Sequence, residues 1–161
     1  LYMNGTEIPK IDVPFSFTRR PRPIPPDLRP DWRVSVLLLI LYYSRGHKVS
    51  LRKLHVINWA IRSADNREVL LDYLLNKTQS YGIVIRFEPG IIRAIDLAKG
   101  YKLVEMEYGT PSGIKLTAKG TETAKKIDSL SDCFEKEREF LINIKPYVKE
   151  KDISVLLNWE N

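Results

Sequence analysis

The chain has 161 residues, 43% of them hydrophobic and 29% charged, a composition typical of an ordinary globular protein with one core. Its formal net charge of +6 permits an acidic partner such as nucleic acid without requiring one. One cysteine excludes an internal disulfide, and with only two histidines it makes no persuasive zinc site, so we expect neither metal nor cofactor. The longest apolar stretch is too short to cross a bilayer, and the first residues do not resemble a secretion signal. We therefore expect a cytoplasmic protein that does not bind membranes.

Residues 1–30 are expected to form an extended arm, because seven of the ten prolines fall there. The arm also carries large apolar side chains, with a period of two from Ile11 through Val13, Phe15 and Phe17. A disordered linker seldom holds so many apolar groups. The arm is therefore expected to dock on its own domain or on a neighbour, and Phe15 and Phe17 are candidate partner contacts.

Three helices are predicted to follow the arm. The first, over residues 31–44, is apolar nearly all round and should be a central buried helix. The second, over residues 51–62, begins after Ser50, which is a favourable N-cap residue. The third spans roughly residues 66–77, with Asp65 as its expected cap.

A second group of elements alternates strands and helices. Alternating apolar residues predict a strand over residues 83–87, and Pro89-Gly90 opens a short helix over residues 91–99. A strand over residues 102–108 and a return strand over residues 114–116 flank a turn rich in glycine and proline. Thr117 then caps a helix that runs to about Leu130.

Residues 131–161 are expected to form a helical extension that Pro146 interrupts. The extension is mildly acidic, with five cations against seven anions, whereas the positive charge is concentrated in residues 31–130. Its apolar residues lie near heptad spacing, which is typical of a helix that pairs with another. The candidate partner contacts here are Phe140, Tyr147, Leu156 and Trp159.

The order helix, strand, turn, strand, helix over residues 91–130 is that of the rear half of a winged helix. The string Ile114-Lys-Leu-Thr-Ala-Lys-Gly120 closely resembles the "Y-x-L-T-x-K-G" that follows the wing in many bacterial winged-helix proteins. The expected fold class is therefore mostly α with a small antiparallel sheet. It comprises a winged helix-turn-helix domain over residues 31–130, the proline-rich arm before it and the helical extension after it. An unrelated hairpin followed by a helix is the alternative.

Winged helices that bind DNA place a helix in the major groove and present polar groups to base edges. The candidate reading helix, residues 90–99, offers only Arg93, Asp96 and Lys99, and isoleucine and leucine dominate the rest. Glu105 and Glu107 share one face of the following strand, where they would repel phosphate groups. A modest basic patch remains, and its residues are candidate DNA contacts: Arg86, Arg93, Lys99 and Lys102. This surface suits a protein partner better than base reading.

A longer resemblance covers roughly residues 29–125. It rests on Arg29-Pro-Asp-Trp-Arg33, on Ser50-Leu-Arg-Lys-Leu-His-Val-Ile-Asn-Trp-Ala-Ile-Arg-Ser63, and on Ile85-Arg-Phe-Glu-Pro-Gly-Ile-Ile-Arg-Ala-Ile-Asp96. These stretches resemble the middle component of bacterial three-component ABC systems, the Lamassu-type anti-phage defence operons. The resemblance implies a small accessory subunit that associates with an SMC-like ABC ATPase and an effector, often a nuclease, so that DNA could be contacted through the complex.

No catalytic constellation accompanies this resemblance. The chain lacks a Gly-x-x-x-x-Gly-Lys-Ser/Thr loop, so ATPase activity would belong to a partner. His55 and the tryptophans are read as packing residues, and Cys133 stands beside acidic residues that disfavour a thiolate. We therefore predict a non-enzymatic accessory subunit that bridges the ATPase and its effector. The alternatives are a winged-helix transcriptional regulator and, third, a nuclease accessory with its own activity.

Overall fold

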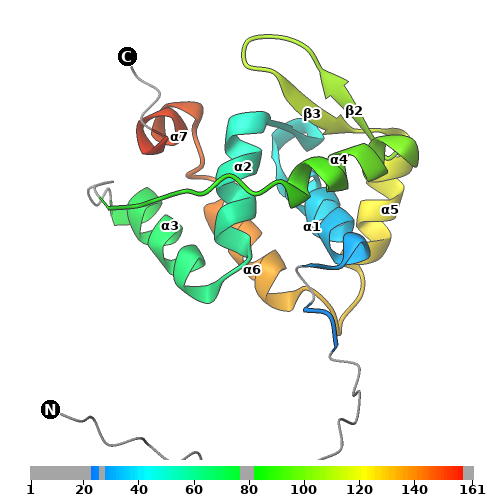
Figure 1. The fold of residues 1–161 in the computed structure, drawn as a ribbon, viewed down its shortest axis with the longest axis horizontal. Coiled ribbons are helices and arrows are strands. Elements are labelled where there is room, and N and C mark those ends of the chain that lie inside the picture. The colour runs from blue at the N-terminus through cyan, green and yellow to red at the C-terminus, as the bar shows by residue number, and fades with distance from the viewer. Residues whose placement is uncertain (1–22, 26–27, 77–81, 158–161) are drawn as a thin grey trace, which may run out of the picture.

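The computed structural model describes residues 23–25, 28–76 and 82–157, and it is an α+β protein with a small antiparallel sheet (Figure 1). In chain order the elements are α1 (Pro30–Tyr43), η2 (Arg45–His47), β1 (Lys48–Ser50), α2 (Leu51–Ile61), α3 (Ala64–Asn76), α4 (Gly90–Gly100), β2 (Val104–Glu107), β3 (Gly113–Leu116), α5 (Ala118–Asp128), α6 (Glu135–Ile144) and α7 (Glu150–Leu156). Most of the predicted arm lies outside the described residues.

Helix α1 forms the centre of the core, as its uniformly apolar sequence predicts. Every residue from 36 to 41 is buried, and α4, α5 and α6 pack around the helix (Figure 1). Pro30 stands in the first turn, where its missing N–H removes no helical hydrogen bond. Because fully burying one leucine side chain contributes about 1.5–3 kcal/mol, this helix anchors the elements that surround it.

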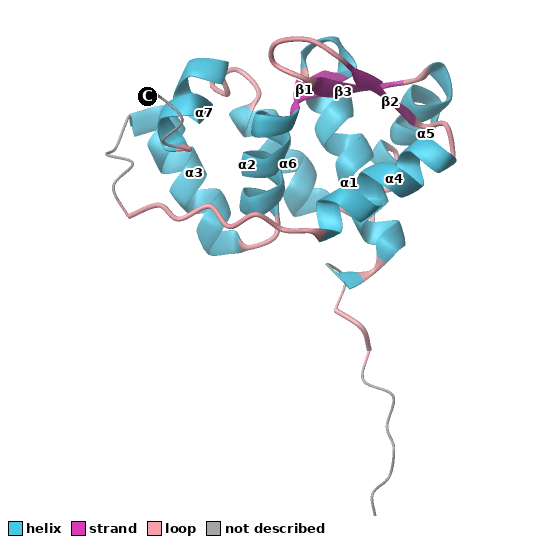
Figure 2. Ribbon diagram, turned by 45° about the horizontal axis from the view of Figure 1, so that its top comes forward, coloured by secondary structure: helices cyan, strands magenta, loops and turns pink. Residues whose placement is uncertain are grey.

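The sheet has the strand order β1-β3-β2, with both pairs antiparallel, and lies along one edge of the helical body (Figure 2). Strand β1 was not predicted, because three residues are too few to show alternation. Its Val49 pairs with Ile114, and both side chains are buried. Gly113 allows this pairing, since a Cβ there would lie 2.5 Å from the carbonyl oxygen of Val49.

The strand predicted over residues 83–87 does not form. The segment runs as an irregular connection from α3 to α4, and in Figure 1 it crosses in front of α2. The predicted alternation is right in part: Ile83 and Ile85 pack on the core while Val84 and Arg86 are exposed, but Phe87, which should share the face of the two isoleucines, is 59% exposed. A strand also needs a neighbour, and no described residue pairs with this segment.

Helices α6 and α7 belong to the same core as the preceding domain. Phe140, Leu141 and Ile144 of α6 are buried, and so are Ile153 and Leu156 of α7. The break at Pro146 is confirmed, because α6 ends at Ile144 and α7 begins at Glu150. None of the described helices combines the length and the apolar character that crossing a bilayer would require.

Candidate interaction surface around helix α4 and the wing

Helix α4 packs one side on α1 and leaves the other exposed. Ile91, Ala94, Ile95 and Ala98 are buried, so two of the four large apolar residues of the helix belong to the core. The outward side carries Ile92, Arg93, Asp96, Leu97 and Lys99. Ile92 is 46% exposed and Leu97 is 40% exposed. The outward side therefore mixes aliphatic and charged groups: Arg93 and Lys99 are of the types that contact guanine, and no asparagine or glutamine stands beside them to contact adenine.

The four candidate DNA contacts lie on α4 and its two flanks, and all of them are exposed. Arg86 precedes the helix, Arg93 and Lys99 lie on it, and Lys102 follows it. None of them makes an ion pair within the described part of the chain. Arg93 and Lys99 are six residues apart, which separates their directions by about 120° around the axis. The side chains of Arg93 and Lys99 therefore do not point together into one groove of DNA.

Glu105 and Glu107 lie on the same sheet face as two lysines. The register places Lys48, Lys115 and Glu105 side by side across β1, β3 and β2. Lys115 Nζ lies 3.1 Å from Glu105 Oε1, and Lys48 Nζ lies 3.3 Å from Glu107 Oε1. The expectation that these carboxylates repel phosphates needs correction in one respect, because the lysines neutralise them and the four charges sum to zero.

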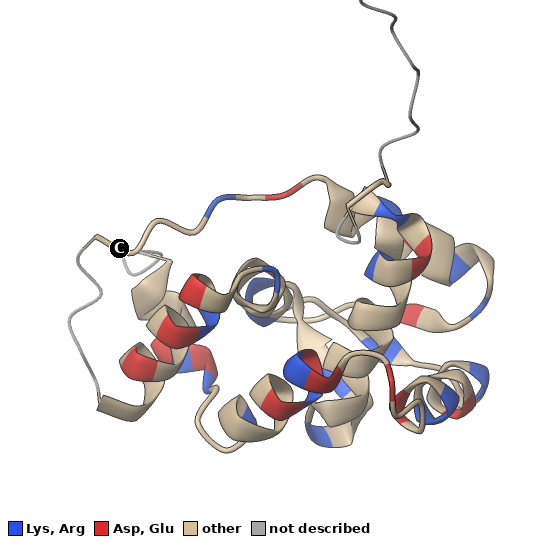
Figure 3. Cartoon of the chain, turned by 90° about the horizontal axis from the view of Figure 1, so that it is seen from below, with Lys and Arg blue, Asp and Glu red and all other residues tan. Residues whose placement is uncertain are grey.

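Charges of both signs are mixed over the rest of the molecule too. Figure 3 shows lysine and arginine interspersed with aspartate and glutamate on the helices in its view. A surface of this kind lacks the single-sign field that steers nonspecific nucleic-acid binding.

The entrance to α4 is held by a cluster of charged and polar side chains. Arg33 on α1 forms a short ion pair with Glu88, just before α4, and Arg62 at the end of α2 lies 3.9 Å from the same carboxylate. Burial alone would raise the pKa of Glu88. The hydrogen bond and charge of Arg33, with smaller contributions from Arg62 and Asn58, hold that pKa below its usual value. Glu88 therefore stays ionised and ties α1, α2 and α4 together.

This cluster joins the three stretches on which the Lamassu resemblance rests. Arg33 ends the first stretch, Asn58 and Arg62 belong to the second, and Glu88 lies in the third. Gly90 completes the arrangement, because a Cβ there would collide with the Arg33 guanidinium and the Glu88 carboxylate. Sequence reasoning missed the cluster. One sequence feature could have indicated it: Glu88 stands directly before Pro89-Gly90 at a predicted helix start, and Arg33 and Arg62 lie on or beside two other predicted helices.

The Leu-Thr-Ala-Lys-Gly string fastens α5 to the turn between α4 and β2. The Thr117 hydroxyl accepts a hydrogen bond from Gly120 N at 3.0 Å, which confirms the predicted cap, and donates to Lys102 O at 2.7 Å. Lys119 Nζ donates to Tyr101 O at 2.9 Å. Lys102 supports the turn with a left-handed backbone, at φ 58°. The string has a structural role, because the side chains of Thr117 and Lys119 form hydrogen bonds with the backbone of the same chain.

His55 packs against the segment that leads to α4. Its ring centroid lies 4.8 Å from that of Phe87, and burial lowers the pKa of His55. This agrees with the prediction of a packing histidine, and the aromatic ring that it contacts is that of Phe87. Trp32 and Trp59 are partly buried against the core, as expected.

A hollow of about 570 Å³ lies between the wing and the C-terminal helices. Apolar side chains such as Val49 and Ile144 line it together with basic ones, Arg45, Lys48, Lys53 and Lys145. Glu107 partners Lys48, and Glu150 lies 3.3 Å from Lys53. This leaves an excess of two positive charges among the residues that line the hollow.

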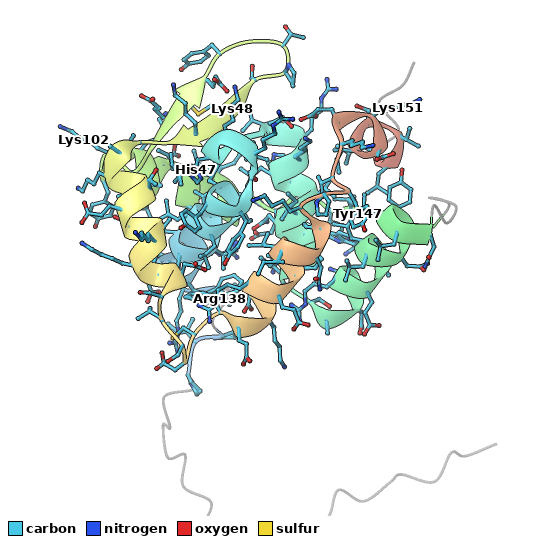
Figure 4. All side chains as sticks on the ribbon, turned by 180° about the vertical axis from the view of Figure 1, so that it is seen from behind. His47, Lys48, Lys102, Arg138, Tyr147 and Lys151 are labelled. Atoms are coloured by element: carbon cyan, nitrogen blue, oxygen red, sulfur yellow. The ribbon has the colours of Figure 1, made fainter. Side chains whose placement is uncertain are left out.

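The predicted partner contacts divide into three groups. Phe140 and Leu156 are buried in the chain's own core, so the structure corrects the expectation that they anchor a partner. Tyr147 is exposed between α6 and α7, and Figure 4 shows it on the opposite side of the view from Lys102. Phe15, Phe17 and Trp159 lie outside the described residues.

Within the described ranges, no three histidine, cysteine, aspartate or glutamate side chains gather where they could hold a metal ion. Comparison with known proteins adds no assignment: no family model, no curated protein and no solved structure matches the chain.

Proposed function

We propose that the chain is a non-catalytic winged-helix subunit of an SMC-like ABC ATPase complex in bacterial anti-phage defence. In that complex it would bridge the ATPase and its effector in the cytoplasm. The outward side of α4 would be a docking surface for a protein partner.

The sheet supports the winged-helix part of the proposal. A winged helix places a short strand after its first helix and pairs that strand with the return strand of the wing. Here β1 follows α1 and pairs with β3, while β2 and β3 enclose the turn over residues 108–112. Helix α4 then stands where winged helices carry their reading helix, and α3 is an additional helix before it.

The observation that carries the functional proposal is the outward side of α4. Ile92 and Leu97 are large, exposed and mounted on a helix that α1 holds rigidly. The buried centre of a protein interface is more apolar than the rest of the surface and is enriched in arginine, whereas base edges are read by polar side chains. The two exposed aliphatic side chains beside Arg93 therefore fit a protein partner better than a base. The ion cluster at Glu88 supports the same proposal, because it fixes the start of α4.

Co-expression with the SMC-like ATPase encoded beside this chain tests the proposal. We expect the two proteins to co-purify at moderate salt and the chain alone to hydrolyse no ATP. Failure to associate, or the absence of such an ATPase gene from the neighbourhood, would contradict the proposal.

A second candidate is a DNA-binding regulator, and the four cations around α4 that form no ion pair with another described residue favour it. For this function, Arg93→Ala with Lys99→Ala should abolish a site-selective shift of operator DNA. The matched pair Lys125→Ala with Lys126→Ala, two exposed cations on α5, should leave the shift unchanged. Binding that is sequence-independent and falls steeply with salt would count against the regulator.

A further inference from the structure

The exposed apolar side chains around α4 are not confined to the helix. The connection over residues 82–89 leads into α4 across the same face of the molecule, with the connection in front of α2 and the helix in front of α1 in Figure 1. Two of its large apolar side chains are more exposed than any on the helix: Val84 is 68% exposed and Phe87 is 59% exposed, against 46% for Ile92. Exposed apolar groups that gather on one face are typical of an interaction site. The apolar face is therefore wider than the outward side of α4.

Phe87 is held in position from three sides. Ile85, two residues earlier, packs against the core, and the next residue, Glu88, forms the ion pair with Arg33. The ring of Phe87 leans on that of His55, with 4.8 Å between the two centroids. A side chain that is fixed before binding loses little conformational freedom when a partner buries it. Phe87 therefore combines the exposure and the rigidity of an interface anchor, a role in which aromatic side chains are common.

The charged groups on this face are mostly cations. Arg86 lies on the connection and Arg93 and Lys99 lie on α4, and none of them forms an ion pair with another described residue. Asp96 is the one acidic residue of α4, and Glu88 is already neutralised in the cluster before the helix. The face therefore complements an acidic surface.

We propose that Phe87 anchors the docking surface, that this surface extends from Val84 to Leu97, and that the segment of the partner which covers it is acidic. The inference rests on the proposed function, which places the SMC-like ATPase on this face. The ring of Phe87 enters an apolar depression of the ATPase, and carboxylates around that depression pair with Arg86 and Arg93.

The same groups disfavour the other occupants of this face. A second copy of the chain would bring a face with an excess of cations against itself, and like charges placed together weaken an interface. DNA phosphates would pair with Arg86 and Arg93, but contacts to phosphate are polar and would leave Val84 and Phe87 uncovered. An acidic protein surface with an apolar depression matches both kinds of group.

Binding of the full chain to the ATPase tests the anchor. Phe87→Ser should raise Kd by at least about tenfold, because truncation of an anchor leaves its pocket on the partner unfilled. The matched control is Tyr147→Ser, which truncates an aromatic side chain that is 43% exposed between α6 and α7, and it should bind like the wild type. Urea unfolding of both variants measures whether the fold is kept, as the exposure of both side chains leads us to expect.

Charge reversal tests the acidic character of the partner. Arg86→Glu with Arg93→Glu should raise Kd by at least about tenfold, mainly through slower association, because the cations no longer attract the partner. The wild type should bind more weakly in about 0.5 M NaCl, and the charge-reversed variant should lose most of that salt dependence. The control, Lys125→Glu with Lys126→Glu on α5, changes the net charge equally and should have a much smaller effect.

Several results would overturn the inference. If Phe87→Ser binds the ATPase as tightly as Tyr147→Ser while Ile92→Glu with Leu97→Glu weakens binding, the docking surface is limited to α4 and the proposed function stands. Equal effects of the two charge reversals would show that the partner is not acidic there. A dimer of the chain alone that Phe87→Ser dissociates in light scattering would assign the face to a second copy. DNA binding that the Arg86 and Arg93 reversal abolishes, with ATPase binding kept, would assign the face to DNA. If the wild type does not bind the ATPase at all, the proposed function fails together with the inference.

Discussion

Gly120 has no room for a side chain, because a Cβ at this position would collide with the carbonyl oxygen of Leu103. The glycine lets the first turn of α5 approach Leu103, just before β2, where the Thr117 hydroxyl donates a hydrogen bond to Leu103 O and the Lys119 ammonium donates one to Tyr101 O nearby. At the residue scale, the string that indicates a winged helix is therefore explained by packing.

Gly120→Ala should lower the free energy of unfolding by about 2 kcal/mol, since overpacking costs about 1–3 kcal/mol. The control is Gly100→Ala, at the end of α4, where no atom lies within 4 Å of the added Cβ. It should leave stability unchanged or raise it by up to about 1 kcal/mol. Urea unfolding of both variants measures the difference, and equal stabilities would contradict the close contact.

Glu88 is the second residue that matters for stability, because its carboxylate forms ion pairs with both Arg33 and Arg62. Glu88→Gln should lower the free energy of unfolding by about 2 kcal/mol near pH 7, since it leaves the half-buried Arg33 guanidinium without a countercharge. As a control, Glu122→Gln disrupts an exposed ion pair with Lys126 and should change stability little. A Glu88→Gln variant as stable as this control would contradict the role assigned to the cluster.

The same carboxylate predicts a pH dependence. The pKa of Glu88 is lower in the folded chain than in the unfolded one, so its contribution is complete above the unfolded pKa of about 4.3. That contribution is lost as pH falls through the lowered, folded value. The stability of wild type and Glu88→Gln should therefore converge as the solution becomes more acidic than about pH 4.

At the scale of elements, the sequence predicted helices better than strands. The uniformly apolar run of α1 and the cap at Thr117 are local signals, so both helices could be placed from the sequence. Strand β1 depends on β3, more than sixty residues later, and no local pattern reveals that pairing. The segment over residues 83–87 shows the reverse case, in which the local pattern is present and the neighbour is missing from the described residues.

The elements also explain why the candidate surface was only partly predictable. The sequence showed that α4 is rich in isoleucine, but only its packing on α1 decides that Ile91 and Ile95 point inward while Ile92 points outward. The pairing of Glu105 and Glu107 with lysines likewise required the register of the sheet. In the same way, the burial of Phe140 and Leu156 depends on how α6 and α7 pack, which heptad spacing alone does not define.

At the scale of the whole molecule, the described chain is one core with two distinct surfaces. The outward side of α4 carries exposed aliphatic and basic groups, while the hollow between the wing and the C-terminal helices has a small positive excess. Helix α1 touches elements that bear both surfaces. The bridging role proposed above would place one partner on each surface.

The most direct test of the account measures how tightly the SMC-like ATPase binds three forms of the chain. Ile92→Glu with Leu97→Glu should weaken binding at least 100-fold, because it places two charges in the proposed contact. Ile142→Glu, on α6, where the side chain is 54% exposed, should bind like the wild type. The α4 variant should also be as stable to urea as the wild type. If it is, and it still binds the ATPase as tightly as the Ile142 control, the outward side of α4 is not the docking surface.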